Sequence, residues 1–293
     1  MTPRRPIPSL LRPGLRAHAA LLAALLAATA PAARAAGPTL AVEDTMRTEV
    51  PEVLVRAPRV TLDEILDRVA RGEARRDSAI RDQAFTATVR LVRHVGDPKQ
   101  APQLVSERVY RTYRKRPDKA RAVLLRSWDL KPERGGAEVR VGTRADMSEE
   151  IVNFAFRPEA RREYRYRIEG RDLLGERLIY RIAFEPRSNL DPAKPSGTVW
   201  VDTNDFVIVR QEVRFDRSPV PLLLRGVDRM VIERGRADGT WVLTRVLLRA
   251  SATIPLPNLG RRFDMAIRFD DYAVNRGIDD AVFEGAGRAE DGR

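Results

Sequence analysis

The sequence predicts a mainly β domain with one N-terminal helix, in which about ten or eleven antiparallel strands form a large curved sheet, a sandwich or a barrel. Apolar and polar residues alternate along most of the chain after residue 83, which is typical of strands with one buried face. Short turn signals separate these stretches. No linker long enough to divide the chain lies between them, so we expect a single domain over residues 59–285.

One segment near the start of this domain has a helical period. Thr61 and Glu64 have the spacing of a capping box, in which each side chain can accept a hydrogen bond from the other residue's free backbone N–H. Apolar residues then recur at helical spacing, at Leu62, Ile65, Leu66 and Val69. We predict an amphipathic helix of about 15 residues that ends near Gly72 or frays through the charged residues 73–78.

The strands are predicted from the alternation within each segment. Residues 261–272, RRFDMAIRFDDY, alternate most cleanly, because four large apolar residues stand at every second position, with Asp264, Ala266 and Arg268 between them. The same period of two recurs in residues 83–95, 104–116 and 163–186. A face that is apolar at every second position is buried while the other face stays in water, so we expect antiparallel pairing.

Two segments break the alternation. Residues 146–163 allow a short helix that begins after Ser148, and residues 218–227 carry three consecutive Leu. We interpret these segments either as ordinary loops that cover the core or as mobile apolar flaps over an opening. In the second interpretation the lid candidates are Ile151, Phe154, Leu222, Leu223 and Leu224.

Residues 1–35 have the pattern of a secretory signal peptide, with several Arg, a short apolar run and small residues from Ala33 to Ala35. The apolar run is about 14 residues long, which is too short for the ~20 residues that cross a bilayer. We expect cleavage after Ala35 and export of the remaining chain. Residues 36–58 are predicted to be a flexible N-terminal arm, and residues 286–293 a disordered tail.

The composition excludes several classes of site. The formal net charge of +12 falls to about +7 without residues 1–35, because these hold five Arg and no acidic residue. The remaining Arg alternate with Asp and Glu, as on a solvated surface, which together with export disfavours a nucleic-acid partner and allows weak attraction to anionic membranes. The chain has no Cys, and His94 is the only His after residue 35. We therefore expect no lipid anchor, no metal site and no other cofactor.

Three segments also resemble a known family by their order and spacing. They are residues 166–187 (YRIEGRDLLGERLIYRIAFEPR), residues 196–215 (SGTVWVDTNDFVIVRQEVRF) and residues 269–283 (FDDYAVNRGIDDAVF). The second contains Gly197, Trp200 and Asp202 in a G-x-x-W-x-D hairpin, and the third contains Tyr272 and Asn275 in a Y-x-V-N tail. Over roughly residues 60–285 the chain resembles the outer-membrane lipoprotein-sorting proteins of the LolA-like superfamily.

This resemblance implies an open, strongly curved antiparallel half-barrel. The N-terminal helix and short lid segments would close its concave side, and its cavity would accept acyl chains. Members of the superfamily carry lipoproteins or other lipids through the periplasm, and RseB-type relatives use the same fold for sensing. The expected location of this chain is therefore the periplasm.

Recognition of an acyl chain requires apolar area rather than nucleophiles, because such a chain has no polar group along its length. Removing ~300 Å² of lipid tail from water contributes roughly 7 kcal/mol, at about 25 cal/mol per Å², before the cost of association. Every second residue of a strand would face the cavity, and plain core packing against the helix is the alternative for each. The cavity candidates are Phe85, Val89, Leu91, Val109, Tyr180, Ile182, Trp200, Val213, Phe263, Met265, Ile267 and Phe269.

Three functions remain open at this point. The first is a periplasmic carrier of lipids or lipoproteins, with their acyl chains and inner- or outer-membrane proteins as partners. The second is an envelope sensor or interaction module of the same fold, without transported cargo. An enzyme is the third, but adjacent carboxylates such as Asp270 and Asp271 point to opposite faces of a strand, so we expect no catalytic site. We expect the chain to be monomeric.

Overall fold

Ten antiparallel strands in one sheet dominate the protein, which confirms the predicted fold class. The computed structural model describes residues 60–95, 100–130, 150–188, 194–216, 218, 224–256 and 258–284. The predicted signal peptide, N-terminal arm and C-terminal tail therefore lie outside the described residues. The strands are β1 (Asp82–Arg93), β2 (Gln103–Lys115), β3 (Lys119–Asp129), β4 (Tyr164–Leu174), β5 (Arg177–Pro186), β6 (Ser196–Asp202), β7 (Ile208–Arg214), β8 (Leu224–Ala237), β9 (Thr240–Leu256) and β10 (Gly260–Val274).

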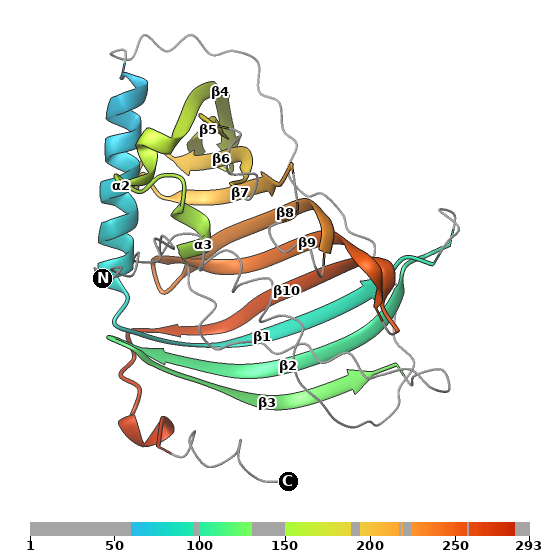
Figure 1. Cartoon of the computed structure of the whole chain (residues 1–293). Helices are drawn as coiled ribbons and strands as arrows, with labels where there is room; N and C mark the ends of the chain where they lie inside the picture. Colours follow the sequence, from blue (N-terminus) through green and yellow to red (C-terminus); the bar gives the residue numbers. More distant parts are fainter. Residues whose placement is uncertain are drawn as a thin grey trace, which may run out of the picture.

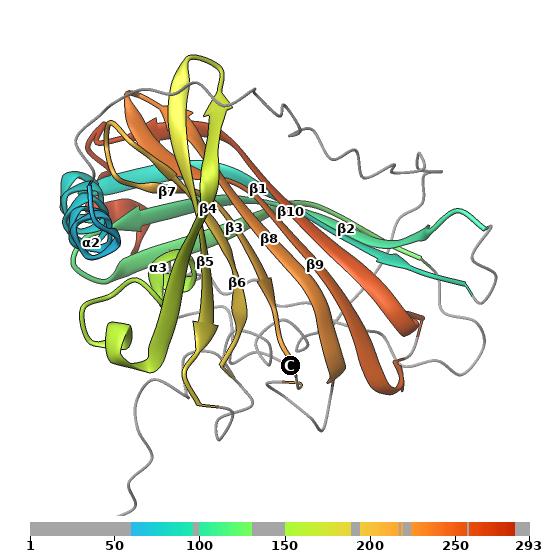
Figure 2. The same ribbon diagram turned by 90° about the horizontal axis from the view of Figure 1, so that it is seen from above.

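The strand order in the sheet is β3-β2-β1-β10-β9-β8-β7-β6-β5-β4. Strands β4 to β10 thus form a meander of consecutive neighbours, and β10 returns to pair with β1. The sheet is strongly curved and twisted (Figure 1, Figure 2), and its edge strands β3 and β4 lie at opposite borders, as Figure 1 shows. It is therefore an open sheet rather than a closed barrel.

The helix α2 (Leu62–Ala79) runs along one end of the strands (Figure 1). Its N-cap is Thr61, whose hydroxyl oxygen accepts the Glu64 N–H at 3.2 Å, as the capping-box spacing predicted. The prediction that the helix ends near Gly72 or frays beyond it was wrong, because the helix stays regular to Ala79. A Cβ at Gly72 would lie 2.3 Å from the carbonyl oxygen of Phe206. Gly72 is therefore a point of close approach between α2 and the turn that joins β6 to β7, and not a helix end.

The two faces of the sheet differ in chemistry. We call the inner face the one on which α2 and the short helix α3 (Glu150–Asn153) pack; it carries an apolar cluster contributed by nine of the strands, all except β3. Val89 lies opposite Ile267 on this face. The outer face carries mostly charged residues in cross-strand pairs, such as Arg249 with Asp264 at 2.9 Å. Two short 3-10 helices complete the described elements, η2 (Ala160–Glu163) and η3 (Asp280–Val282).

Candidate functional site

The inner face collects ten of the twelve apolar residues that the sequence singled out. All ten belong to the same cluster, and none is more than 9% exposed. They come from β1, β5, β7 and β10, which are far apart in the sequence. The ten are Phe85, Val89, Leu91, Tyr180, Ile182, Val213, Phe263, Met265, Ile267 and Phe269. Side chains predicted from separate segments thus form one surface, and their contact with a ligand remains a prediction.

Val109 lies on the outer face, so its prediction as a residue that shares this surface was wrong. It pairs with Thr88, which lies on the polar side of β1. Strand β2 contains an extra residue, Val105, beside the step from Leu91 to Val92 in β1. This bulge brings Val105 into the inner cluster, although it has the same parity as Val109.

Trp200 also lies on the outer face, and its prediction as a cavity residue was wrong for a different reason. Its neighbours Val199 and Val201 both point to the inner face, so Trp200 points away. Its indole N–H donates to Asp172 at 3.2 Å, and the Arg210 guanidinium stacks 5.3 Å from the ring centroid. A stretch of three apolar residues in one strand does not reveal from the sequence alone which of them faces the core.

Five aromatic side chains close the inner face next to α3. Phe184 lies at their centre, with its ring centroid 5.7–5.8 Å from those of Phe154, Phe156 and Tyr164. The fifth, Tyr166, donates its hydroxyl to the Ala155 carbonyl, and burial raises the pKa of that hydroxyl above its usual range. Of this group only Phe154 is among the candidates from the sequence. Phe156 lies in a segment without alternation, whereas Tyr164, Tyr166 and Phe184 lie in the alternating residues 163–186, where nothing local marks them as one group.

The structure places the lid candidates in different surroundings. Phe154 packs against the inner cluster from the α3 segment. Leu224 is the first residue of β8 and is 1% exposed within the cluster, so it belongs to the core and its assignment to a lid was wrong. Leu222, Leu223 and the side chain of Ile151 lie outside the described residues.

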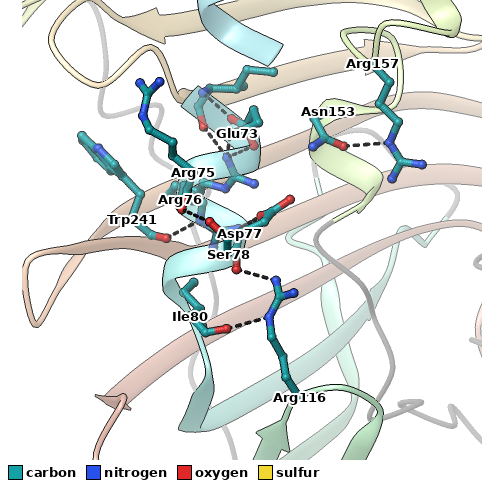
Figure 3. A network of polar contacts seen from close by, with 12 residues as sticks. Glu73, Arg75, Arg76, Asp77, Ser78, Ile80, Arg116, Asn153, Arg157 and Trp241 are labelled. Atoms are coloured by element: carbon teal, nitrogen blue, oxygen red, sulfur yellow. Dashed lines mark hydrogen bonds and ion pairs between the residues drawn. The ribbon is translucent and has the colours of Figure 1, made fainter. Parts of the chain in front are cut away.

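Buried charges attach α2 to the strands. The Nη1 atom of Arg234 donates to the two carboxylate oxygens of Glu73 at 2.8 and 2.9 Å, and Glu73 also accepts the backbone N–H of Ile208 at 2.7 Å. One turn further on, Nε of Arg76 donates to the Trp241 carbonyl at 2.7 Å (Figure 3). Burial, together with the nearby charge of Arg234, lowers the pKa of Arg76 to about 10. These charged residues anchor the helix rather than fray it.

The G-x-x-W-x-D residues stabilise a hairpin. A Cβ at Gly197 would lie 2.0 Å from the Glu212 carbonyl oxygen, so only glycine allows β6 and β7 this close approach. Asp202 accepts the backbone N–H groups of Asn204 and Asp205 at 3.1 and 2.7 Å, and it binds Nε of Arg177 at 2.6 Å. Burial opposes ionisation of Asp202, but these hydrogen bonds outweigh it and hold its pKa below the ordinary value.

The Y-x-V-N residues have a similar structural role. Tyr272 donates its hydroxyl to the Leu243 carbonyl at 2.6 Å, and burial raises the pKa of that hydroxyl. The side-chain oxygen of Asn275 accepts the Arg81 N–H at 2.7 Å, and its amide nitrogen donates to the Ala79 carbonyl at 2.7 Å. Asn275 therefore joins the end of β10 to the turn between α2 and β1.

We expect Asp202→Asn to lower the free energy of unfolding by about 1–3 kcal/mol near neutral pH, because the Arg177 guanidinium loses one of its two carboxylate acceptors and keeps only Asp205. The contribution of a carboxylate with a lowered folded-state pKa is fully present above its unfolded-state pKa of about 4 and is lost as the pH falls through the folded-state pKa. The deficit of the variant should therefore shrink below about pH 4. Urea unfolding at pH values above and below 4 measures this deficit, and Asp216→Asn at an exposed position is the control. A deficit that is independent of pH would contradict the assignment.

A polar hollow of about 620 Å³ lies on the outer face of β4 to β8. Its charged lining consists of four Arg and four carboxylates: Arg165, Arg167, Arg214, Arg229, Glu169, Glu185, Glu212 and Asp228. Several of these bind one another, as Arg229 binds Glu212 at 2.9 Å and Arg167 binds Glu169 at 3.0 Å. Because the two signs balance, the hollow has no strong preference for either an anion or a cation.

The described residues contain no group of three or more His, Cys, Asp or Glu that could hold a metal ion. His94 lies with Nε2 3.1 Å from Oδ1 of Asp264, which Arg249 also binds. Burial opposes ionisation of Asp264, but the hydrogen bonds from Arg249 and the nearby His94 hold its pKa below the ordinary value. Within the described ranges, no helix is both long enough and apolar enough to span a bilayer.

Comparison with solved structures finds similarity over about three quarters of the chain. A DUF1329 family protein from Desulfovibrio piger is 16% identical, with 76% of this chain and 97% of that protein covered and a TM-score of 0.43. A LolA superfamily protein from Nitrosomonas europaea is 12% identical, with coverages of 76% and 97% and a TM-score of 0.34. The lipoprotein LppX from Mycobacterium tuberculosis is 11% identical, with coverages of 75% and 99% and a TM-score of 0.27. No protein-family model and no curated protein matches the chain. The fold assignment therefore rests on the strand pairing of this chain itself.

Proposed function

We propose that this protein binds the acyl chains of lipids or lipoproteins on the inner face of its sheet, and that it carries them through the periplasm as part of lipoprotein sorting. The observation that carries the proposal is the continuous apolar cluster on one face of an open sheet. In the part of the chain that the structure describes, helices rather than a second sheet cover this face. An acyl chain can bury its apolar surface against such a face.

The aromatic group at α3 is the proposed entrance. Helix α3 has four residues, Glu150–Asn153, and so short a helix depends on packing for its position. Its segment is attached to β4 and β5 by the ring contacts of Phe154 and Phe156 with Phe184. An acyl chain that displaced these two rings would keep Phe184 out of water, so the exchange preserves buried apolar area.

A binding experiment tests this function. We expect the purified protein to contain lipid detectable by native mass spectrometry, and the delipidated protein to bind the fluorescent fatty acid cis-parinaric acid. Met265→Trp adds volume on the inner face and is expected to reduce binding about tenfold. The matched control is Val109→Trp, which adds the same ring on the outer face and should bind as the wild type does.

Two outcomes oppose the proposal. One is a delipidated, folded protein that binds no fatty acid. The other is equal loss of binding in the two Trp variants, which would place the ligand elsewhere. Circular dichroism and melting temperatures show whether each variant is folded before its binding is compared.

A second candidate function is an interaction module of the cell envelope that transports no cargo. The low exposure of the inner-face residues favours it, since none of the ten exceeds 9%. In that case the inner face is a filled core, and function belongs to an outer surface or an edge. A stoichiometric protein partner recovered together with a lipid-free protein would support this candidate over the carrier.

A further inference from the structure

Cationic side chains border the aromatic group at the proposed entrance. The segment between α3 and β4, residues 157–163, contains three Arg and two Glu. Within it, Nε of Arg157 donates to the side-chain oxygen of Asn153 in α3 at 3.3 Å (Figure 3). Arg187 follows β5, and its backbone N–H donates to the Glu163 carbonyl at 2.8 Å, which places it beside this segment. We call four residues the rim arginines: Arg157, Arg161, Arg162 and Arg187.

Two of the rim arginines lie close to members of the aromatic group. Nε of Arg187 donates to the carbonyl of Tyr164 at 2.8 Å. Burial raises the pKa of the Tyr166 hydroxyl, and the nearby charges of Arg161 and Arg187 partly oppose this rise. The Nε atom of Arg161 is buried without a hydrogen-bond partner among the described residues, so an oxygen that reached it would satisfy this donor. Guanidinium groups thus lie where the apolar inner face ends.

Positive charge is in excess at this border. Within the described ranges, the side chain of Arg187 donates only to a backbone carbonyl, and the exposed side chain of Arg162 has no hydrogen bond or ion pair. The nearby carboxylates of Asp67 and Glu163 are already bound by other cations, Asp67 by a rim arginine and Glu163 by a lysine. Glu159 is the other carboxylate of the segment. Among the described side chains of the border, five cations therefore stand against three carboxylates.

The polarity of an acyl ligand determines where its headgroup lies. An apolar tail gains free energy when it leaves water, whereas a charged headgroup that leaves water loses its solvation. The tail therefore belongs on the inner face and the headgroup at the border of that face with water, beside the rim arginines. A guanidinium presents several N–H donors in one plane, and this geometry matches the oxygens of a carboxylate or a phosphate.

We propose that the rim arginines, chiefly Arg162 and Arg187, bind the anionic headgroup of the acyl ligand, so that the protein prefers fatty acids and acidic phospholipids to neutral or zwitterionic lipids with the same chains. The inference rests on the proposed function, because it assigns the polar end of the same ligand. The hollow on the outer face differs from this border, since four carboxylates balance its four Arg. An excess of cations beside an apolar surface matches a ligand with one acidic end.

A charged and a neutral probe with the same chain test the preference. At about pH 8 and low salt, we expect the delipidated protein to bind cis-parinaric acid about tenfold more tightly than its methyl ester. In the double variant Arg162→Gln with Arg187→Gln the acid should lose this advantage, while the ester binds as it does to the wild type. The matched control is Arg81→Gln with Arg261→Gln, which removes two exposed Arg at the starts of β1 and β10 and should keep the tenfold preference.

Salt, phosphate and intact lipids test the headgroup contact further. Sodium chloride at about 0.5 M should reduce the preference of the wild type severalfold, because it screens exposed charges. At equal ionic strength, inorganic phosphate should displace no more cis-parinaric acid than chloride does, because phosphate lacks the tail that supplies the apolar contact. Offered equal amounts of phosphatidylglycerol and phosphatidylcholine with the same chains, the wild type should retain mainly phosphatidylglycerol in native mass spectrometry. The double variant at the rim should retain the two lipids equally.

The outcomes separate this inference from the function on which it rests. Equal affinity of the wild type for the acid and the ester overturns the inference and leaves the proposed function standing, whereas failure to bind either probe overturns both. An equal loss of preference in the control variant indicates an effect of net charge alone and overturns the inference, as does displacement of the acid by inorganic phosphate. Melting temperatures close to that of the wild type confirm that each variant is folded.

Discussion

Glu73→Gln is expected to lower the free energy of unfolding by about 3–5 kcal/mol, because it removes the carboxylate charge that faces the buried guanidinium of Arg234. The side chains of Glu73 and Arg234 are 3% and 1% exposed, so water cannot replace the lost charge. Glu73 also accepts the N–H of Ile208, where β7 begins. The substitution therefore weakens the contact between α2 and the sheet at its most buried point. Urea unfolding monitored by circular dichroism measures the effect.

The matched control lies on the same helix. Glu64 is bound to Arg68 in an exposed pair four residues apart, so Glu64→Gln should cost at most about 0.5 kcal/mol. Equal costs at the two positions would contradict a buried anchor. The double variant Glu73→Met with Arg234→Met removes both charges, and its cost should be smaller than the sum of the single changes. A residual cost is expected, because both side chains also bind the backbone of Ile208.

Phe184→Ala is expected to lower the free energy of unfolding by about 3–5 kcal/mol through the cavity that it leaves. Phe184 is 2% exposed, and its ring contacts three other aromatic rings between α3 and β5. The half-buried Phe215→Ala removes the same ring near the end of β7 and should cost clearly less. Chemical unfolding of both variants checks the difference.

Phe184→Ala also tests the proposed function. If the inner face accepts an acyl chain beside the aromatic group, the space left by Phe184→Ala should take up part of that chain. Added fatty acid should then raise the melting temperature of Phe184→Ala more than that of Phe215→Ala, because a ligand that binds only the folded state stabilises it. Equal shifts in the two variants would place the ligand away from this group.

The residues that carry the family resemblance turned out to be structural. Gly197, Asp202 and Asn275 allow close strand approach, bind turn N–H groups or join the end of β10 to the start of β1. Each depends on a local hydrogen bond or a local steric limit, and such features leave a recognisable pattern in sequence. A ligand surface made of interchangeable apolar side chains leaves only the period of two. This is why the architecture could be predicted from the sequence, whereas the binding residues remained candidates.

The sequence by itself determined the local features of this protein: the start of α2 at Thr61, the approximate number of strands, and the separation of most strands into an apolar and a charged face. Only the tertiary structure decided that α2 continues past Gly72, that Val109 and Trp200 face outward, and that the aromatic group forms around Phe184. The physical reason is the distance along the sequence over which each interaction acts. Capping and alternation act between residues a few positions apart, whereas bulges, buried ion pairs and ring contacts depend on segments that meet only when the sheet assembles.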